Sequence, residues 1–440
     1  MFARIALMGL LLGMVGCGRP ATPETVEIIG AAGTSTIPST AQLPAPTFAP
    51  SDWPGWRGPN SDGVAADSAV PTKWDDVTNV VWKTKIPGRG HGSPVIIGDQ
   101  IYLETADDAA QVQSVLAVDR RRGKLLWQTD LHTGNFETAM HGENTHASST
   151  LACDGERLFA VFLNNRRVWC SALSLDGNEL WKTEVGGFRS RFGYSASPTI
   201  YQSLVFVAAD HEDGGFIAGL DRGSGDVVWR RKRPANASWC SPRVVHLGGK
   251  DQLVLCGCQR VISYDPLTGT ELWNVAGTTE STVGSAVVSG DLLIFSGGYP
   301  GKDTVALKPN GSVAWRIKDK TYVPSLLAAE GFVYMIQDDT GVVRCFEAAT
   351  GKERWKHRIG GNFRASPLLC NGKIYVTDMS GKTTVFAADP KQFTLIAENQ
   401  LGTEGFSSPA VSDGQLFLRV PDGSRGGRQE WLYCIGEKSR

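Results

Sequence analysis

The stretch AVDRRRGKLLW (residues 117–127) decides the fold, because its pattern returns later in the chain. It contains the end of one strand, a turn with a glycine, and a second strand that leads into a tryptophan. The same order occurs in SYDPLTGTELW (residues 263–273) and in ATGKERW (residues 349–355). A unit that recurs along one chain predicts a repeat architecture.

Each unit begins with a small polar residue, usually beside a proline, and continues into short apolar and aromatic runs. LFAVF (residues 158–162) is one such run, rich in the residues that favour strands. The units recur about every 40 to 55 residues, which predicts a four-stranded antiparallel sheet in each. The eight unit openings are Ser93-Pro94, Ser149-Thr150, Ser197-Pro198, Ser241-Pro242, Ser285-Ala286, Pro324-Ser325, Ser366-Pro367 and Ser408-Pro409.

Tryptophan occupies the same place near the end of the first six units, whereas Leu395 stands there in the seventh. Equal positions favour packing between neighbouring sheets, with each indole N–H donating to a backbone carbonyl. A binding surface is the alternative interpretation. The six residues are Trp127, Trp181, Trp229, Trp273, Trp315 and Trp355.

The last unit lacks an outer strand, while the orphan strand VVWKTKI (residues 80–86) precedes the first unit. Pairing this strand beside the one around Trp431 would remove an open sheet edge. We therefore expect an all-β fold, an eight-bladed β-propeller of four-stranded antiparallel blades over residues 52–436. The ring would be closed by the N-terminal strand.

The N-terminus predicts export. Arg4 and an apolar run over residues 5–15 are typical of a signal peptide, and Gly16-Cys17 follows at the cleavage position. We expect residues 1–17 to form a lipoprotein signal with Cys17 lipidated, and residues 18–51 to form a flexible Ala/Thr/Pro-rich tether. An ordinary secreted signal peptide is the alternative. The predicted location is the bacterial cell envelope, with membrane contact through the lipid anchor only.

Charge and cysteines limit the functional classes. The 440 residues contain 44 Lys and Arg against 45 Asp and Glu, so nothing favours a nucleic-acid partner. Of the eight cysteines besides Cys17, Cys153 and Cys370 occupy equivalent places in their repeats, and so do Cys170 and Cys345, as small buried hydrophobic residues do. A disulfide is plausible only for Cys240, with Cys256 or Cys258. We expect a monomer.

Loops that enter the innermost strands meet at one end of a propeller's channel, and here they are rich in arginine, histidine and aromatic residues. Such side chains could clamp and stack on a planar anionic ligand. Alternatively, they tie the loops together by local hydrogen bonds. The predicted ligand-binding residues are His91, Asn144, His146, Arg191, Tyr194 and Trp239.

The segment HGENTH (residues 141–146) also raises a metal hypothesis, with His91 as a third ligand. However, its spacing is not that of a helical His-Glu-x-x-His site, and we expect it in a loop. Hydrogen bonding to the loop or to a ligand is the favoured interpretation. No metal ligand and no catalytic residue is assigned.

The segments at 117–127 and 263–273 resemble the tryptophan-docking repeat of pyrroloquinoline-quinone-type (quinoprotein) propellers, a repeat also found in the assembly lipoprotein of the outer-membrane barrel-assembly machinery. The lead-in WPGWRGPNSDG (residues 53–63) is similar to the opening of exported quinoprotein-like propellers. Active quinoprotein dehydrogenases are expected to carry an adjacent cysteine pair and calcium ligands. This chain has only Cys256-Gly257-Cys258 and no evident calcium set, which weakens the cofactor expectation.

We therefore expect a non-enzymatic envelope lipoprotein whose propeller binds a protein partner or a small anionic ligand. The alternative is a pyrroloquinoline-quinone-dependent dehydrogenase, or a quinone or sugar-acid sensor, that uses the central channel. An enzyme of this chain would be a quinoprotein-type oxidoreductase. No cofactor is assigned beyond that alternative.

Overall fold

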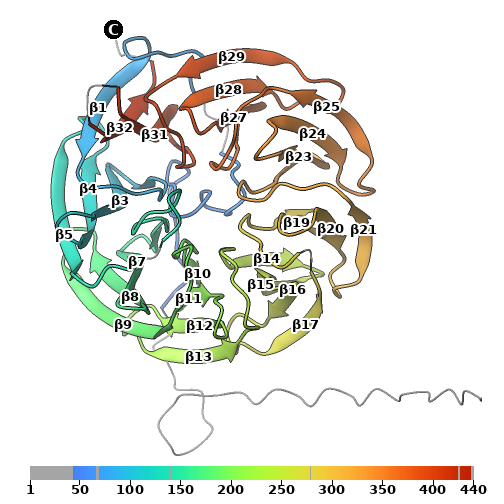
Figure 1. The fold of residues 1–440 in the computed structure, drawn as a ribbon, viewed down its shortest axis with the longest axis horizontal. Helices are drawn as coiled ribbons and strands as arrows, with labels where there is room; N and C mark the ends of the chain where they lie inside the picture. The colour runs from blue at the N-terminus through green and yellow to red at the C-terminus, as the bar shows by residue number, and fades with distance from the viewer. Residues whose placement is uncertain (1–42, 66–68, 139, 278, 425–426, 438–440) are drawn as a thin grey trace, which may run out of the picture.

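The computed structural model describes residues 43–65, 69–138, 140–277, 279–424 and 427–437. Within these ranges, the strands form eight four-stranded antiparallel sheets arranged as a ring of blades (Figure 1). The expected eight-bladed, all-β propeller is therefore confirmed. The signal peptide, Cys17 and most of the predicted tether lie outside the described residues. No helix in these ranges is long and apolar enough to cross a membrane.

The first four blades follow one another along the chain, each from its innermost to its outermost strand. Blades 1 and 2 consist of β2 (Val95–Ile97), β3 (Gln100–Asp107), β4 (Val112–Asp119) and β5 (Leu125–Thr133), then β6 (Ala152–Cys153), β7 (Arg157–Asn164), β8 (Arg167–Ser174) and β9 (Glu179–Gly187). Blades 3 and 4 consist of β10 (Thr199–Tyr201), β11 (Leu204–Ala209), β12 (Phe216–Asp221) and β13 (Val227–Lys232), then β14 (Arg243–Leu247), β15 (Lys250–Gly257), β16 (Arg260–Tyr264) and β17 (Glu271–Ala276).

The next blades repeat the plan, and the last takes its outermost strand from the other end of the propeller sequence. Blades 5 and 6 consist of β18 (Val287–Ser289), β19 (Leu292–Gly297), β20 (Asp303–Leu307) and β21 (Val313–Ile317), then β22 (Leu327–Ala329), β23 (Phe332–Ile336), β24 (Val342–Glu347) and β25 (Glu353–Arg358). Blades 7 and 8 consist of β26 (Leu368–Cys370), β27 (Lys373–Thr377), β28 (Lys382–Ala387) and β29 (Leu395–Gln400), then β30 (Ala410–Ser412), β31 (Gln415–Asp422), β32 (Gln429–Ile435) and β1 (Val80–Ile86).

The core lies in the seams between blades. The two middle strands of each blade are buried along most of their length, whereas outer strands such as β9 are largely half-exposed or exposed. Both faces of a middle strand are apolar, so each sheet must pack against a neighbour on either side. At the closing seam, Leu116 of blade 1 packs in one cluster with Phe417 and Tyr433 of blade 8.

The repeated tryptophans dock across the seams, as the sequence predicted. Trp127 lies over Gly177 in the next blade, and its indole donates to the Leu175 carbonyl at 3.1 Å. Gly177 has a positive φ of 86°, and a Cβ there would lie 2.7 Å from the indole ring. Only glycine therefore allows both the turn and the close approach. Equivalent indole-to-carbonyl bonds are made by Trp82, Trp181, Trp229, Trp315 and Trp355, whereas Trp273 donates to the Gln252 side chain.

The N-terminal strand closes the ring as expected. β1 pairs antiparallel with β32, with Trp82 opposite Cys434 and Lys85 opposite Trp431. Trp82 then supplies the docking tryptophan of blade 8, because its indole donates to the Arg120 carbonyl of blade 1 at 2.9 Å. Blade 8 itself has no turn between its two outer strands, since they come from opposite ends of the propeller sequence. The prediction that Leu395 takes the tryptophan position of blade 7 is wrong, because Ala397 pairs with Val385 as Trp355 pairs with Cys345 in blade 6. Ala397 is buried and too small to reach a neighbouring turn, whereas Leu395, two residues earlier, is 51% exposed.

The polar residues that open each unit form a belt around the channel. A backbone N–H of one blade donates to the hydroxyl of the next, so the belt holds the innermost strands in register. Six links connect Ser93 to Thr150 (2.9 Å), Thr150 to Ser197 (3.0 Å), Ser197 to Ser241 (2.8 Å), Ser285 to Ser325 (3.0 Å), Ser325 to Ser366 (2.9 Å) and Ser366 to Ser408 (2.8 Å).

The lead-in segment, residues 53–65, lies across the channel between the blades (Figure 1). Trp53 forms a bridge with Ile96 of blade 1, and Val64 forms one with Leu369 of blade 7. Residues 43–51, which composition assigns to the tether, also contact the ring, because the Arg222 guanidinium donates to the Pro44 carbonyl. Further links join Pro54 to Cys153 (2.7 Å), Arg57 to Leu326 (2.7 Å) and Asn60 to Arg243 (2.6 Å).

Candidate functional site

A pocket of about 520 Å³ lies at the mouth of the channel, on the face that carries the loops entering the innermost strands. Every blade contributes to it, so its shape depends on the whole ring. Trp56 of the lead-in segment also lines it, and the indole donates to the Ser285 hydroxyl at 3.3 Å. One lining residue from each blade, in order, is His91, His141, Phe192, Trp239, Val283, Tyr322, Arg364 and Phe406.

The pocket is walled mainly by rings. His91 stacks on Phe406 with ring centres 4.3 Å apart, and Phe192 meets Trp239 edge-on at 5.4 Å. Burial, with nearby arginines adding to it, lowers the pKa of His91 well below its usual range, so the imidazole is neutral at neutral pH. These contacts fix flat apolar faces around the cavity, and Tyr299 at the rim is 61% exposed.

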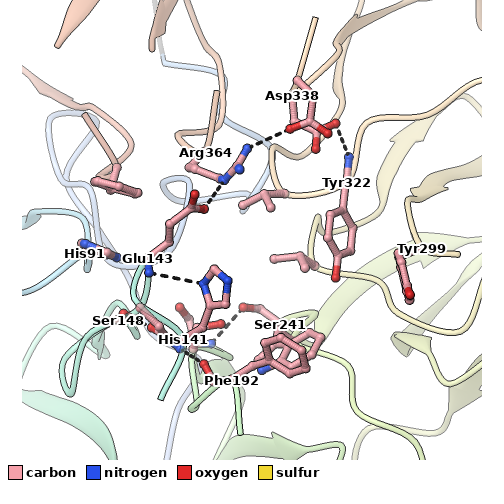
Figure 2. A pocket seen from close by; sticks show the side chains of 18 of the residues that line it. His91, His141, Glu143, Ser148, Phe192, Ser241, Tyr299, Tyr322, Asp338 and Arg364 are labelled. Carbon is pink, nitrogen blue, oxygen red and sulfur yellow. Dashed lines mark hydrogen bonds and ion pairs between the residues drawn. The ribbon is translucent and has the colours of Figure 1, made fainter. Parts of the chain in front are cut away.

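The charged groups of the pocket are largely paired with one another (Figure 2). Arg364 Nε lies 2.9 Å from a Glu143 oxygen, and its Nη1 lies 3.5 Å from Asp339. Lys320 donates to the Gly298 carbonyl at 2.9 Å and lies 5.4 Å from the Tyr322 ring centre. Three carboxylates thus face one arginine and one lysine, which differs from the excess of positive charge that the sequence suggested.

Asp338 is the deepest carboxyl of the pocket and is only 2% exposed. One of its oxygens accepts from the Tyr322 backbone N–H at 3.2 Å, and the other has no hydrogen-bond partner among the described residues. Burial raises the pKa of Asp338, and the neighbouring Asp339 adds to this effect.

Of the six residues predicted to bind a ligand, the structure brings together His91, Asn144 and Trp239 in the pocket. The Asn144 amide also donates to the Phe192 carbonyl at 2.6 Å, and the Trp239 indole donates to the Gly193 carbonyl at 2.9 Å. Both side chains therefore order the neighbouring loop while presenting a surface to the cavity. Their contact with a ligand stays a prediction.

The other three predicted residues do not line this pocket. Tyr194 is buried and donates to the Ala208 carbonyl at 2.9 Å. Arg191 is exposed, with its guanidinium 4.9 Å from the Phe192 ring centre. His146 lies beside a smaller hollow, where one ring nitrogen is 2.8 Å from Asp108 and the other 3.1 Å from the Glu137 carbonyl. These hydrogen bonds of Tyr194 and His146 agree with the alternative interpretation, in which the side chains hold the loops in place.

The described side chains give no support to the metal hypothesis for residues 141–146. In the described ranges, no group of three His, Cys, Asp or Glu side chains is placed to hold a metal ion. Glu143 is engaged by Arg364, and the backbone N–H of Glu143 lies 3.3 Å from a His141 ring nitrogen. Hydrogen bonds and ion pairs to neighbouring loops account for Glu143, Asn144 and His146.

The eight cysteines of the propeller are buried thiols. Cys240 and Cys256 are in contact as two thiols rather than as the disulfide considered from the sequence. The hydrogen bond between the two thiols lowers the pKa of Cys240 and raises that of Cys256. Cys258 instead donates to the Asn236 carbonyl at 3.0 Å.

Several pocket residues were missed from the sequence. Tyr299, Asp338 and Asp339 come from the connections between the second and third strands of blades 5 and 6, and Trp56 comes from the lead-in segment. In a four-stranded antiparallel blade, this connection lies at the same end as the loop entering the innermost strand. The strand order alone could therefore have predicted that Tyr299, Asp338 and Asp339 lie at the pocket end of the channel.

Pyrroloquinoline quinone, a tricarboxylate, does not fit the side chains of this pocket. Such a ligand needs free cations, yet Arg364 is shared by two carboxylates and Lys320 is bound to a carbonyl. Asp338 would oppose a further negative charge in a poorly hydrated setting. No redox step is derived for this chain.

Comparisons with solved structures support the fold. The chain superposes on BamB from Moraxella catarrhalis with a TM-score of 0.57 and 17% identity, covering 80% of this chain and 99% of that one. For the quinohemoprotein alcohol dehydrogenase of Comamonas testosteroni, the TM-score is 0.65 with 12% identity, covering 89% and 81%. Identities this low show a common fold and leave function open.

Sequence comparisons identify the family. The tetrathionate hydrolase of Acidithiobacillus ferrooxidans is 24% identical over 354 residues, which are 68% of this chain and 65% of the hydrolase. BamB of Yersinia pestis is 22% identical over 378 residues, which are 78% of this chain and 87% of the relative. Residues 111–356, 301–394 and 339–427 match the model of one family. The chain therefore belongs to the family described as outer membrane protein assembly factor BamB.

Proposed function

We propose that this protein is a non-catalytic scaffold of the cell envelope, which binds a segment of a partner protein at the mouth of its channel. The observation that carries the proposal is the pocket itself: about 520 Å³, walled by aromatic rings and contributed by every blade. Its volume suits a few side chains of a docked segment. Rigid aromatic anchors in a pocket are typical of protein-binding surfaces.

The pairing of polar groups favours binding over catalysis. Arg364, Glu143 and Asp339 hold one another, and Asn144 and Trp239 hold the neighbouring loop. A catalytic acid or base needs a partner arrangement that delivers a proton to a substrate atom, whereas these bonds hold the walls in place. The related proteins named as outer membrane assembly factors support a protein as the partner.

Envelope location belongs to the same proposal. It rests on the order of Arg4, the apolar run and Cys17 in the sequence. We expect mass spectrometry of the natively expressed protein to find an acylated N-terminal cysteine at position 17. An unmodified mature N-terminus beyond residue 17, or a cytoplasmic protein, would contradict it.

Site-specific photo-crosslinking in the native host tests partner binding. A benzophenone amino acid would replace Tyr299, which is 61% exposed at the rim, in the full-length chain. The control position is Leu180 of β9, which is 51% exposed on an outer strand. We expect one discrete envelope protein to be crosslinked at position 299 and not at position 180. Equal adducts at both positions, or none at 299, would overturn the proposal.

A further inference from the structure

Like Nε2 of the neutral His91 ring, one buried oxygen of Asp338 has no hydrogen-bond partner at the pocket within the described part of the chain. The Asp338 side chain is 2% exposed, and its second oxygen meets no hydrogen-bond donor among the described residues. Its backbone is fixed, because the Asp338 carbonyl accepts from the Phe363 N–H at 2.7 Å. Leaving a buried carboxylate oxygen unpaired is costly, so a donor brought by a ligand would gain more here than at an exposed acid.

The charges around Asp338 leave a local excess of carboxylates. Asp339 and Glu143 share Arg364, whose guanidinium also donates to the Phe363 carbonyl at 3.1 Å. The remaining cation, Lys320, is held by the Gly298 carbonyl at 2.9 Å. Neither Arg364 nor Lys320 is bonded to the unpaired oxygen of Asp338.

Aromatic rings stand at the same end of the pocket. Figure 2 shows Tyr322 beside Asp338, with Tyr299 on the neighbouring loop. Gly298 allows this approach, since a Cβ at that position would lie 2.3 Å from Tyr322 Cβ. Ring faces beside a carboxylate attract a cation that is removed from water.

We propose that this end of the pocket binds a single cationic group, a guanidinium or a primary ammonium, carried by a side chain of the docked partner segment. This inference rests on the proposed function only in naming a partner protein as the source of the cationic group. The cationic donor completes the hydrogen bonding of Asp338, and its charge offsets the three carboxylates. An anionic side chain would be repelled by these carboxylates and would find Arg364 and Lys320 already bonded.

Calorimetric titration of the full-length chain in detergent tests the chemistry without the partner. The probes are N-acetyl-arginine amide, its neutral isostere N-acetyl-citrulline amide, and N-acetyl-glutamate amide, each up to millimolar concentration. We expect the arginine probe to bind at least tenfold more tightly than either of the others. Absence of binding by the arginine probe, or equal binding by citrulline or glutamate, would overturn the inference.

Matched variants locate the site. Asp338→Asn keeps the size of the side chain, and we expect it to weaken arginine-probe binding at least tenfold. The control is Asp213→Asn, because Asp213 lies on the equivalent connection of blade 3, is 55% exposed and pairs with Arg189 at 3.4 Å. If Asp338→Asn lowers the melting temperature, Tyr299→Ala, at an exposed position, provides the second test. Unchanged binding in both variants would place the cation elsewhere and refute the assignment.

The results also separate this inference from the proposed function. Arginine-probe binding without a Tyr299 crosslink would keep the cation site and reject the protein partner. A Tyr299 crosslink without arginine-probe binding would keep partner docking and reject the cation site.

Discussion

Replacing Trp82 by alanine tests how the ring is closed. The half-buried Trp82 ring covers the Gly123 turn of blade 1, and the indole donates to the Arg120 carbonyl at 2.9 Å. Removing a fully buried tryptophan costs about 3–5 kcal/mol, of which a hydrogen bond accounts for roughly 1 kcal/mol. Because Trp82 is only half-buried, we expect a loss near the lower limit, about 3 kcal/mol.

Urea unfolding of the full-length chain in detergent, followed by tryptophan fluorescence, measures this loss. For a propeller of this length, about 3 kcal/mol corresponds to a decrease in melting temperature of roughly 4 °C. Trp82→Phe retains a ring and loses the hydrogen bond, so we expect about 1 kcal/mol. Leu395→Ala is the control on the outermost strand of blade 7, where 51% exposure limits the loss to less than about 1 kcal/mol.

Comparing the stability losses of these variants shows whether Trp82 holds the closing seam. If Trp82→Ala costs no more than Leu395→Ala, then Trp82 does not hold the closing seam. The assignment of β1 as the outermost strand of blade 8 would then lose its energetic support.

Two further predictions concern buried groups. Burial raises the pKa of Glu104 well above its usual 4.5, so the native state favours the protonated carboxyl, and this contribution to stability falls as pH rises above about 4.5. Glu104→Gln should therefore be more stable than the unmodified protein at pH 8 and about equal to it at pH 5 in urea unfolding; a loss at pH 8 would contradict this. The propeller cysteines are buried, so a thiol reagent should modify them only after unfolding, and rapid labelling of Cys240 or Cys256 in the native protein would show that blade 4 opens.

Much of the fold could be predicted because the sequence repeats its turn chemistry. The glycine before each docking tryptophan identifies the blades, and the orphan strand with Trp82 identifies the closure. The serine belt was harder to predict, since a serine beside a proline indicates a strand start as readily as an interblade hydrogen bond. The indole of Trp273 bonds to a side chain instead of a backbone carbonyl, a detail that no repeat pattern specifies.

The site was only partly predictable. Register places His91, Asn144 and Trp239 at one end of the channel, and the structure has all three in the pocket. Register does not say which way a loop side chain turns, so Tyr194 is instead packed against its own blade through the Ala208 carbonyl. The charge of the pocket could not be counted from one set of loops, because Asp338 and Asp339 arrive on a different set.

Blocking the pocket tests the central claim, partner binding at the channel mouth, most directly. Ser195 lines the cavity and is half-buried, so Ser195→Trp would fill space there with little strain on the blade core. The measurement is the photo-crosslink from position 299 in the native host, with and without this substitution. We expect Ser195→Trp to abolish the adduct while the melting temperature stays within about 2 °C. An undiminished adduct in the blocked protein would contradict the claim, because the partner would then bind outside the pocket.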